Sequence, residues 1–202
     1  VDIYDDSMWL IDLVENLLSV TRIEEGRMQI RQSAELVDEV IKEALKHTGQ
    51  SRTGRTIKVE EEDELILAKM DARLIVQVLI NLIGNAVKYT PQGTDITVRV
   101  KKEKAENAER SQVIISVCDL GNGIPDDRKE RVFDMFYTGS DQVADSRRSL
   151  GLGLGLCRSI INAHGGKIWI SDNIPHGAVV TFTLPAEEVA LNEYTFDIGC
   201  GG

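Results

Sequence analysis

Three polar side chains recur at helical spacing within residues 81–89, which read NLIGNAVKY. Asn81 and Asn85 are four residues apart and Lys88 follows three residues later, so a helix would place all three on one face. Amide oxygens are hard ligands that suit magnesium, magnesium commonly bridges to phosphate oxygens, and a lysine directs positive charge at phosphate. Tyr89 would lie beside a bound base. The pattern therefore predicts a magnesium and phosphate site, with a solvated helix face as the alternative.

A second candidate begins where the apolar run VIISVC ends at Asp119, in the sequence DLGNGIP. A carboxylate at the end of a strand can accept a hydrogen bond from the exocyclic amine of adenine. Gly121 and Gly123 would let the following loop fold tightly against a flat base. The alternative is an ordinary strand-to-turn transition with a solvated aspartate.

Three glycines, Gly151, Gly153 and Gly155, alternate with leucines just before a helical pattern. A helix N-terminus has unpaired backbone N–H groups and a partial positive charge, so it binds phosphate where the backbone can be approached closely. No lysine-serine or lysine-threonine pair follows, so this is not a Walker loop, and it is not a plain dinucleotide fingerprint. A flexible turn into a helix is the alternative interpretation.

In this order, the three segments resemble the N box, first G box and second G box of the Bergerat ATP-binding fold, and FDMF at 133–136 resembles its F box. The resemblance covers about residues 33–185. Histidine kinases, type II topoisomerases, mismatch-repair ATPases and one chaperone family share this fold. The resemblance implies an α+β protein, a two-layer α/β sandwich whose mixed sheet is covered by helices on one face, preceded by one long helix.

The resemblance also implies that ATP and Mg²⁺ bind between the N-box helix and the polar segment 138–150, which would form a mobile lid. Many relatives have an arginine shortly after the F box, where this chain has Thr138; Arg147 or Arg148 would reach the terminal phosphate instead, unless both are solvated. The implied catalytic residues are Asn81, Lys88, Arg147 and Arg148. The implied nucleotide-binding residues are Asn85, Lys88, Tyr89, Asp119, Gly121, Gly123, Gly151, Gly153 and Gly155, with Asn85 and Asn81 as magnesium ligands.

The residue four positions before Asn85 separates the branches of this superfamily. Hydrolysing members resemble one another in having a glutamate there, which activates water. This chain has Asn81, and an amide cannot accept a proton at neutral pH. The sequence therefore favours phosphoryl transfer and resembles a sensor histidine kinase, most closely the Kdp-type potassium-sensing kinases. The alternatives are an ATP-hydrolysing member, a serine kinase of the anti-sigma type and a degenerate nucleotide-binding scaffold.

The phosphorylated histidine of such kinases lies on a helix that would precede this chain, in a segment like His-Glu-Leu-Arg-Thr-Pro. His47, His164 and His176 are poor substitutes, and His164 fits a structural capping role at a helix end. We therefore expect this chain to bind ATP but not to phosphorylate itself. Residues 1–27 resemble the second helix of a dimerisation domain, 28–187 would form the catalytic domain, and 188–202 would be a disordered tail.

Hydrophobic periodicity predicts the elements that position these residues. Helices are expected at 4–25, 33–48 with Ser33 as N-cap, 71–90 ending before Pro91, near 128–136, and 153–163. Strands are expected at 28–31, 55–61, 64–70, 94–103, 112–120, 166–173 and 177–185. The pairs 55–61 with 64–70 and 166–173 with 177–185 are predicted to form hairpins, the first around Glu62 and Asp63.

The chain has 202 residues, 42% of them hydrophobic, and a formal net charge of −10. This acidity argues against a nucleic-acid binder, which needs a basic face. No run of eighteen apolar residues is present, so we expect no membrane contact from this part of the protein. Three cysteines without a spacing pattern fit a reducing cytoplasm.

We expect the cytoplasmic portion of a membrane-anchored bacterial sensor, homodimeric at full length, that passes phosphate to a response regulator.

Overall fold

The computed structural model describes residues 29–48, 56–62, 65–104, 111–137 and 151–187, together with Val14, Leu18 and Thr21. These three single residues have α-helical backbone. The rest of the predicted helix over 4–25 lies outside the described residues. The same is true of the proposed lid with Thr138, Arg147 and Arg148, and of the tail at 188–202. None of the described helices is both long and apolar enough to cross a bilayer.

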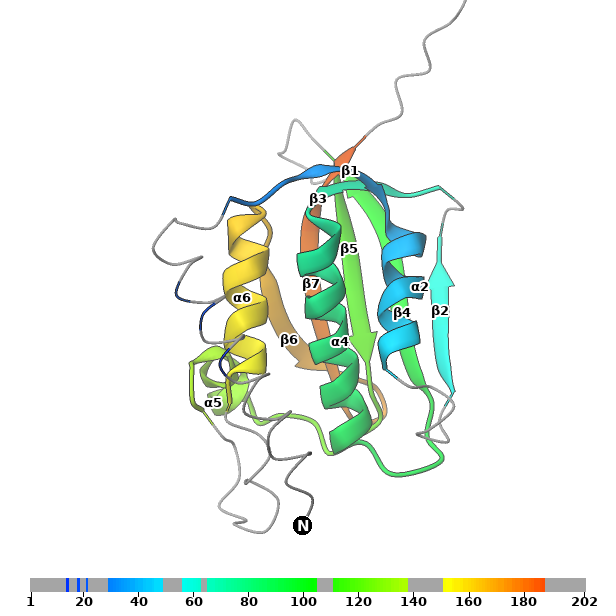
Figure 1. The fold of residues 1–202 in the computed structure, drawn as a ribbon. Helices are drawn as coiled ribbons and strands as arrows, with labels where there is room; N and C mark the ends of the chain where they lie inside the picture. The colour runs from blue at the N-terminus through cyan, green and yellow to red at the C-terminus, as the bar shows by residue number, and fades with distance from the viewer. Residues whose placement is uncertain are drawn as a thin grey trace, which may run out of the picture.

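A seven-stranded mixed sheet forms one layer of the molecule (Figure 1). Its strands follow the order β1-β3-β7-β5-β4-β2, and β6 pairs with β7 beside this path. Only β2 and β4 pair in parallel among the described strands. The strands are β1 (Ser33–Leu36), β2 (Ile57–Glu61), β3 (Leu67–Met70), β4 (Ile96–Lys104), β5 (Ser111–Cys118), β6 (Ile168–Asp172) and β7 (Ala178–Glu187).

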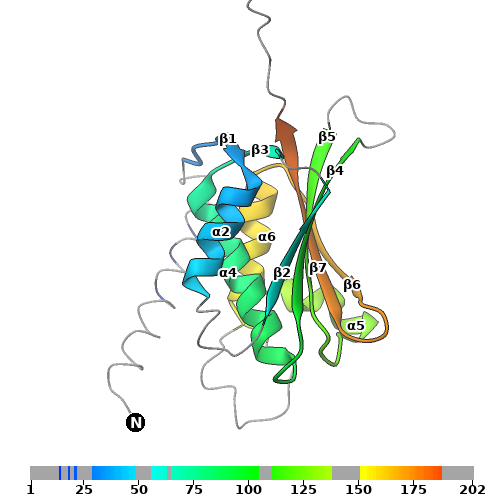
Figure 2. The same cartoon turned by 90° about the vertical axis from the view of Figure 1, so that its right-hand side faces the viewer.

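Three helices form the second layer and cover one face of this sheet (Figure 2). They are α2 (Val37–His47), α4 (Ala72–Tyr89) and α6 (Gly153–Ala163). A short helix α5 (Asp126–Lys129) and a 3₁₀ turn η1 (Arg131–Phe133) lie between β5 and α6 in the chain. The predicted α+β sandwich with helices on one face is therefore confirmed, and α6 has the bounds predicted for it.

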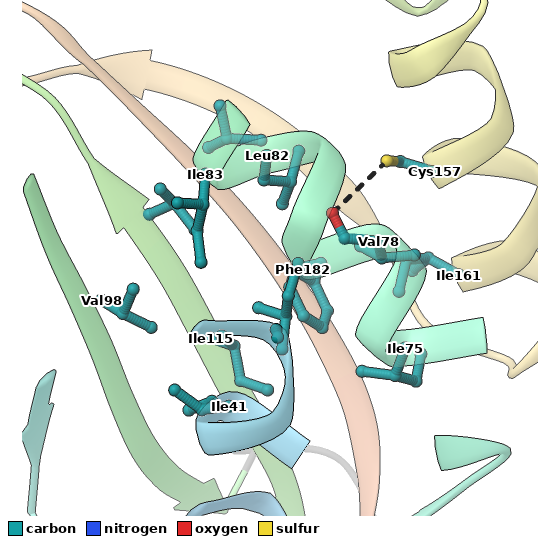
Figure 3. Packing of buried hydrophobic residues seen from close by; sticks show 14 of the residues in the cluster. Ile41, Ile75, Val78, Leu82, Ile83, Val98, Ile115, Cys157, Ile161 and Phe182 are labelled. Carbon is teal, nitrogen blue, oxygen red and sulfur yellow. Dashed lines mark hydrogen bonds between the residues drawn. The ribbon is translucent and has the colours of Figure 1, made fainter. Parts of the chain in front are cut away.

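The core lies between these two layers (Figure 3). The apolar side of α4 contributes Ile75, Val78 and Leu82, which are at most 1% exposed. The sheet presents alternate side chains to it, because successive residues of a strand point to opposite faces. Among these, Ile115 and Phe182 are fully buried. This packing fixes the rotation of α4 about its axis, and so fixes the direction of the polar side chains on its other side.

The segment at 29–48 differs from the sequence prediction. Ser33 does not cap a helix, because Ser33–Leu36 is a strand paired antiparallel with Leu67–Met70. The helix begins instead at Val37, whose N–H donates to the carbonyl of Ile66. The predicted strand at 28–31 is irregular over its described residues, 29–31. Pairing with β3 thus competes successfully with helix propensity at 33–36.

The predicted hairpin of β2 and β3 is wrong, although both strands exist. β2 pairs in parallel with β4, with Ile57 opposite Ile96. β3 lies between β1 and β7 at a separate place in the sheet. Ala68 and Met70 of β3 are completely buried, which is typical of an interior strand, whereas β2 is an edge strand with one buried residue. The predicted hairpin of β6 and β7 is confirmed.

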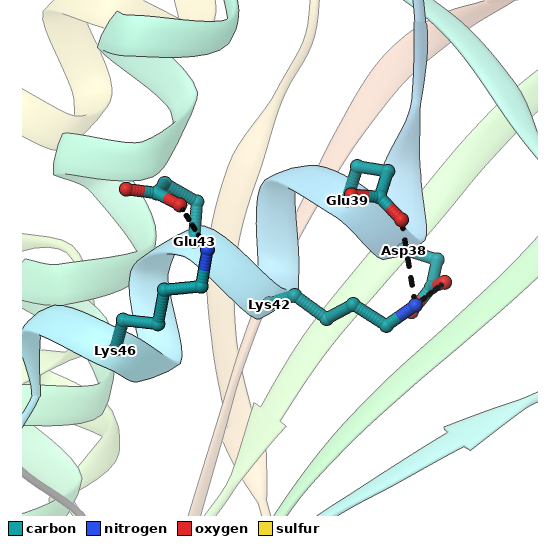
Figure 4. Close-up of polar contacts among 5 residues, drawn as sticks. All are labelled: Asp38, Glu39, Lys42, Glu43 and Lys46. Carbon is teal, nitrogen blue, oxygen red and sulfur yellow. Dashed lines mark hydrogen bonds and ion pairs between the residues drawn. The ribbon is translucent and has the colours of Figure 1, made fainter.

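The outer face of α2 is covered by local ion pairs (Figure 4). Lys42 pairs with Asp38 and Glu39, and Lys46 pairs with Glu43. Such exposed pairs, three or four residues apart, are screened by solvent and contribute little to stability. They mark the solvent face of α2, and they lie on a different helix from the predicted site residues.

Candidate nucleotide-binding site

Helix α4 carries its polar side chains along the edge of its buried face. Asn81 and Asn85 are half-buried, whereas Lys88 and Tyr89 at the end of the helix are exposed. Lys88 Nζ lies 5.1 Å from the centre of the Tyr89 ring. The predicted face therefore exists, and it runs from the edge of the core to the surface at the end of the helix.

The Asn81 side chain contacts the start of α6. A Cβ placed on Gly153 would lie 3.7 Å from Asn81 Oδ1, so the Asn81 side chain of α4 packs directly against the start of α6. The Nδ2 atom of Asn81 is buried and has no hydrogen-bond partner among the described residues. The Asn81 amide also lies beside the Cys157 thiol and favours its charged form, so its N–H groups face the interface between the two helices. Its amide oxygen is a hard group of the kind that Mg²⁺ prefers.

Cys157 lies one helical turn beyond Gly153 and faces the same helix (Figure 3). Its thiol is 3.8 Å from the carbonyl of Val78 in α4. Burial raises the pKa of the Cys157 thiol to about 12, and the nearby Asn81 amide only partly opposes this. The residue is therefore an inert, protonated part of the interface between α4 and α6.

The loop after β5 lies against the C-terminal end of α4. A Cβ on Gly121 would lie 2.6 Å from the carbonyl oxygen of Tyr89, which is closer than any side chain tolerates. Gly123 has a φ of +72°, a conformation that favours glycine. The two glycines therefore allow this loop to pack on the helix end, and bring Asp119 to the same end of the sheet as Tyr89.

Asp119 is held firmly at the end of β5. Its N–H donates to Ala178 O at 2.9 Å, and its Oδ1 accepts hydrogen bonds from the N–H groups of Gly121 at 2.8 Å and Ala178 at 3.2 Å. No donor among the described residues reaches Oδ2. The residue is only 9% exposed. One carboxylate oxygen is thus engaged in structure, and the other remains to accept a hydrogen bond from a ligand.

The three glycines at the start of α6, Gly151 just before it and Gly153 and Gly155 in its first turn, have different surroundings. Gly151 has a φ of +66°, and a Cβ there would lie 2.3 Å from the carbonyl oxygen of Tyr137. Gly155 is buried on another side of α6, where a Cβ would lie 3.2 Å from Phe133 O. Of the three, only Gly153 faces Asn81. Gly151 and Gly155 pack against the segment at 133–137, and the nucleotide contact predicted for all three glycines stays a prediction.

The described parts of the predicted site come together. Helix α4 contacts the second glycine segment through Asn81 and Gly153, and the first through Tyr89 and Gly121. Asn85 lies one turn after Asn81 and one turn before Tyr89 on the same helix. Two segments separated in the sequence therefore contact the C-terminal half of α4.

Each of the three described histidines is either exposed or hydrogen-bonded within the fold. His164 is buried at the C-terminus of α6, where its Nδ1–H donates to Ile160 O at 2.7 Å and its Nε2 accepts the N–H of Asp71 at 3.0 Å. The predicted structural role of His164 agrees with this geometry. His47 is exposed on α2. His176 lies in the β6–β7 turn, with Nδ1 3.2 Å from Gly121 O.

The sequence analysis missed one participant, the turn between β6 and β7. Asn173 in this turn donates from Nδ2 to the carbonyl of Asp119 at 2.8 Å. The two residues are 54 positions apart, and SDNIPHG has the composition of an ordinary turn. No local signal could have indicated this contact.

Comparison with known proteins places these features in a family. The model of the histidine kinase-, DNA gyrase B- and HSP90-like ATPases matches residues 70–188. Sensor protein KdpD of Clostridium acetobutylicum is 41% identical over 185 residues, which is 92% of this chain and 20% of the relative. The chain thus spans about a fifth of that curated relative.

Solved structures give a consistent result. The nucleotide-free catalytic domain of the histidine kinase ThkA is 31% identical, with a TM-score of 0.60, and the match covers 78% of this chain and 96% of that domain. ThkA in complex with the response regulator protein TrrA is 28% identical, with a TM-score of 0.65, and covers 88% of this chain and 49% of that one. Nearly the whole ThkA catalytic domain therefore has its counterpart within this chain.

Proposed function

The chain belongs to the histidine kinase-, DNA gyrase B- and HSP90-like ATPases and contains the ATP-binding catalytic domain of a sensor histidine kinase, and we propose that it transfers the γ-phosphate of ATP to a histidine outside this sequence. From that histidine the phosphate would pass to an aspartate of a response regulator. The observation that carries this proposal is that both glycine segments contact the C-terminal half of α4, one at Asn81 and the other at Tyr89.

Each described residue has a role that follows from its position. Asp119 Oδ2 accepts a hydrogen bond from the adenine amine, because Oδ1 is already engaged. Asn85 and Asn81 would hold Mg²⁺ through their amide oxygens, and the ion would supply neutralisation of charge on the phosphates. The N-terminal N–H groups of α6 would donate to phosphate oxygens. Lys88 adds positive charge at the open side of the site.

The identity of residue 81 supports transfer over hydrolysis. An amide cannot remove a proton from water, and Asn81 occupies the position where a base would act. Asp119 cannot replace it, because its carboxylate lies at the opposite end of the α4 contact region and is tied to two backbone N–H groups. Catalysis would therefore consist of positioning and charge stabilisation, as in other phosphoryl transfers.

Several finer features of the sequence prediction belong to the same proposal. Residues 1–27 would be the second helix of a dimerisation domain, 28–187 the catalytic domain, and the full-length protein a membrane-anchored homodimer. Arg147 or Arg148 would contact the terminal phosphate. Potassium sensing is suggested by the 41% identity to Sensor protein KdpD. Arg147 and Arg148, and residues 1–27 apart from Val14, Leu18 and Thr21, lie outside the described residues.

A nucleotide titration tests the proposal. The chain with Mg²⁺ is titrated with ATP by calorimetry, beside Asp119→Asn and the exposed control Asp127→Asn. Loss of a hydrogen bond to a charged acceptor lowers affinity about tenfold or more. We expect this loss in Asp119→Asn, unchanged affinity in Asp127→Asn, and unchanged thermal unfolding in both. Equal affinity of all three proteins would refute the adenine role, and steady phosphate release by the chain alone would favour a hydrolysing ATPase.

A further inference from the structure

The turn between β6 and β7 interlocks with the loop that carries Asp119. A Cβ on Gly177 in this turn would lie 2.0 Å from the carbonyl oxygen of Asp119, and one on Gly123 would lie 3.1 Å from the carbonyl oxygen of Gly177. The two backbones are therefore in direct contact, with no room for a side chain. From the turn side, His176 adds a contact to Gly121 O at 3.2 Å.

Asn173 uses its backbone N–H and both ends of its side-chain amide in this region. Its backbone N–H donates to Gly177 O at 3.0 Å, and its Oδ1 accepts the N–H of Ile174 at 3.0 Å, so both groups close the turn itself. Its Nδ2 then donates to Asp119 O at 2.8 Å. The side chain thus couples the shape of the turn to the position of the aspartate.

The contact completes the restraint on Asp119. Ala178 and Gly121 hold its N–H and its Oδ1, and Asn173 holds its carbonyl. Every hydrogen-bonding atom of the residue except Oδ2 therefore has a protein partner. A recognition group held by its neighbours in the binding geometry loses little freedom when the ligand arrives, and so binds more tightly.

We propose that Asn173 is a positioning residue for purine recognition, which holds the Asp119 carboxylate so that Oδ2 meets the exocyclic amine of the base. This inference rests on the proposed function, because it assigns Asp119 to adenine. Asn173 does not touch the nucleotide itself, so its contribution is limited to nucleotides that offer a donor to Oδ2.

The test compares two nucleotides in calorimetric titrations with the complete chain. ATP offers the amine, and purine riboside triphosphate lacks it but keeps the ring and the phosphates. Asn173→Ala should lower ATP affinity about three- to tenfold, the effect of one hydrogen bond, and leave the affinity for purine riboside triphosphate unchanged. Asn173→Asp keeps the Oδ1 contact that closes the turn but removes the donor, so it should lose at least as much. Ile174→Ala, at a side chain 90% exposed, is the matched control and should bind both normally.

A double-mutant cycle shows whether Asn173 acts through Asp119. In the Asp119→Asn background, Asn173→Ala should have no further effect on ATP affinity, since coupled residues are not additive. Equal losses for both nucleotides, or additive losses in the cycle, would mean a general structural role and would overturn the inference. If Asp119→Asn lowers ATP affinity but both Asn173 variants bind ATP normally, this inference fails alone. Unchanged affinity in Asp119→Asn would refute the proposed function itself.

Discussion

Asn81 of α4 and Gly153 of α6 face each other, with the Asn81 Oδ1 3.7 Å from the place that a Cβ of residue 153 would occupy. This distance is an ordinary van der Waals contact, so an alanine at 153 fits the folded protein. It would nevertheless project a methyl group into the space between the amide and the helix N-terminus. Packing alone therefore does not require a glycine at 153, and we propose that it leaves room for the nucleotide.

Gly153→Ala and Gly151→Ala should therefore separate binding from stability. Alanine at 153 should leave thermal unfolding unchanged or slightly raised, because it favours the helix, while ATP affinity falls. Alanine at 151 meets both a φ of +66° and the Tyr137 carbonyl at 2.3 Å, and should destabilise the fold by about 1–3 kcal/mol. Calorimetric unfolding and ATP titration of the two variants measure both effects. A strongly destabilised Gly153→Ala protein would contradict the assignment of that glycine to access.

The buried cysteines should be unreactive in the native protein. Burial raises the pKa of Cys157 to about 12, and it also raises the pKa of Cys118. Because the thiolate is the reactive form, neither should be alkylated by iodoacetamide at pH 8, and both should be alkylated in urea. Mass spectrometry of the labelled peptides resolves the two sites. Rapid native labelling of Cys157 would show that α4 and α6 do not pack as described.

His164 should make the stability of the fold dependent on mildly acidic pH. Burial lowers its pKa from the ordinary value of 6.5, with the contact to Ile160 O and the charge of Asp71 opposing this. The folded protein therefore resists protonation of His164 more than the unfolded chain does. Its contribution is complete above pH 6.5, and is lost as the pH falls from 6.5 toward the lowered pKa.

Urea unfolding at pH 7.5 and 5.5 checks this. His164→Ala leaves the Asp71 N–H without its acceptor, and should cost about 1–3 kcal/mol at pH 7.5. The difference from the wild type should shrink at pH 5.5, because the wild type alone has a histidine to protonate at this position. A constant difference at both pH values would contradict the expected loss of stability on acidification.

Some helices were predicted well because the signals that start and end them lie within a few residues of their ends. The bounds of α6 follow from the glycine-rich start and the apolar periodicity, and α4 ends where Pro91 approaches. Strand partners were not predictable in the same way, because β2 and β3 both alternate and nothing in either specifies β4 or β7. The segment at 33–36 has a helical pattern but pairs with β3, so a tertiary contact decided its conformation.

The candidate site likewise has features that local sequence reveals and features that depend on tertiary contacts. Asn81, Asn85, Lys88 and Asp119 could be predicted because their spacing and their positions at element ends are visible in the sequence. The burial of Gly155 against Phe133 could not, since it depends on how the segment after α5 crosses α6. The hydrogen bond from Asn173 to Asp119 arises only because β6 and β7 turn beside the end of β5.

The chain should bind ATP without phosphorylating itself. His164 is buried and hydrogen-bonded through both ring nitrogens, so it cannot accept a phosphoryl group in the folded protein. Incubation with γ-labelled ATP and Mg²⁺ should leave no acid-labile label on the chain. Acid-labile label at His47 or His176, located by mass spectrometry, would overturn this expectation.

The most direct test of the central claim is an NMR titration of the ¹⁵N-labelled chain with a non-hydrolysable ATP analogue and Mg²⁺. A single shared pocket predicts that the backbone amides of Gly121 and Gly153 and the side-chain amides of Asn81 and Asn85 shift together, with one dissociation constant. Omission of Mg²⁺ should reduce the shifts of the two asparagines most. Saturable binding that moves Gly121 but leaves Gly153 and both asparagine side chains unchanged would contradict the account.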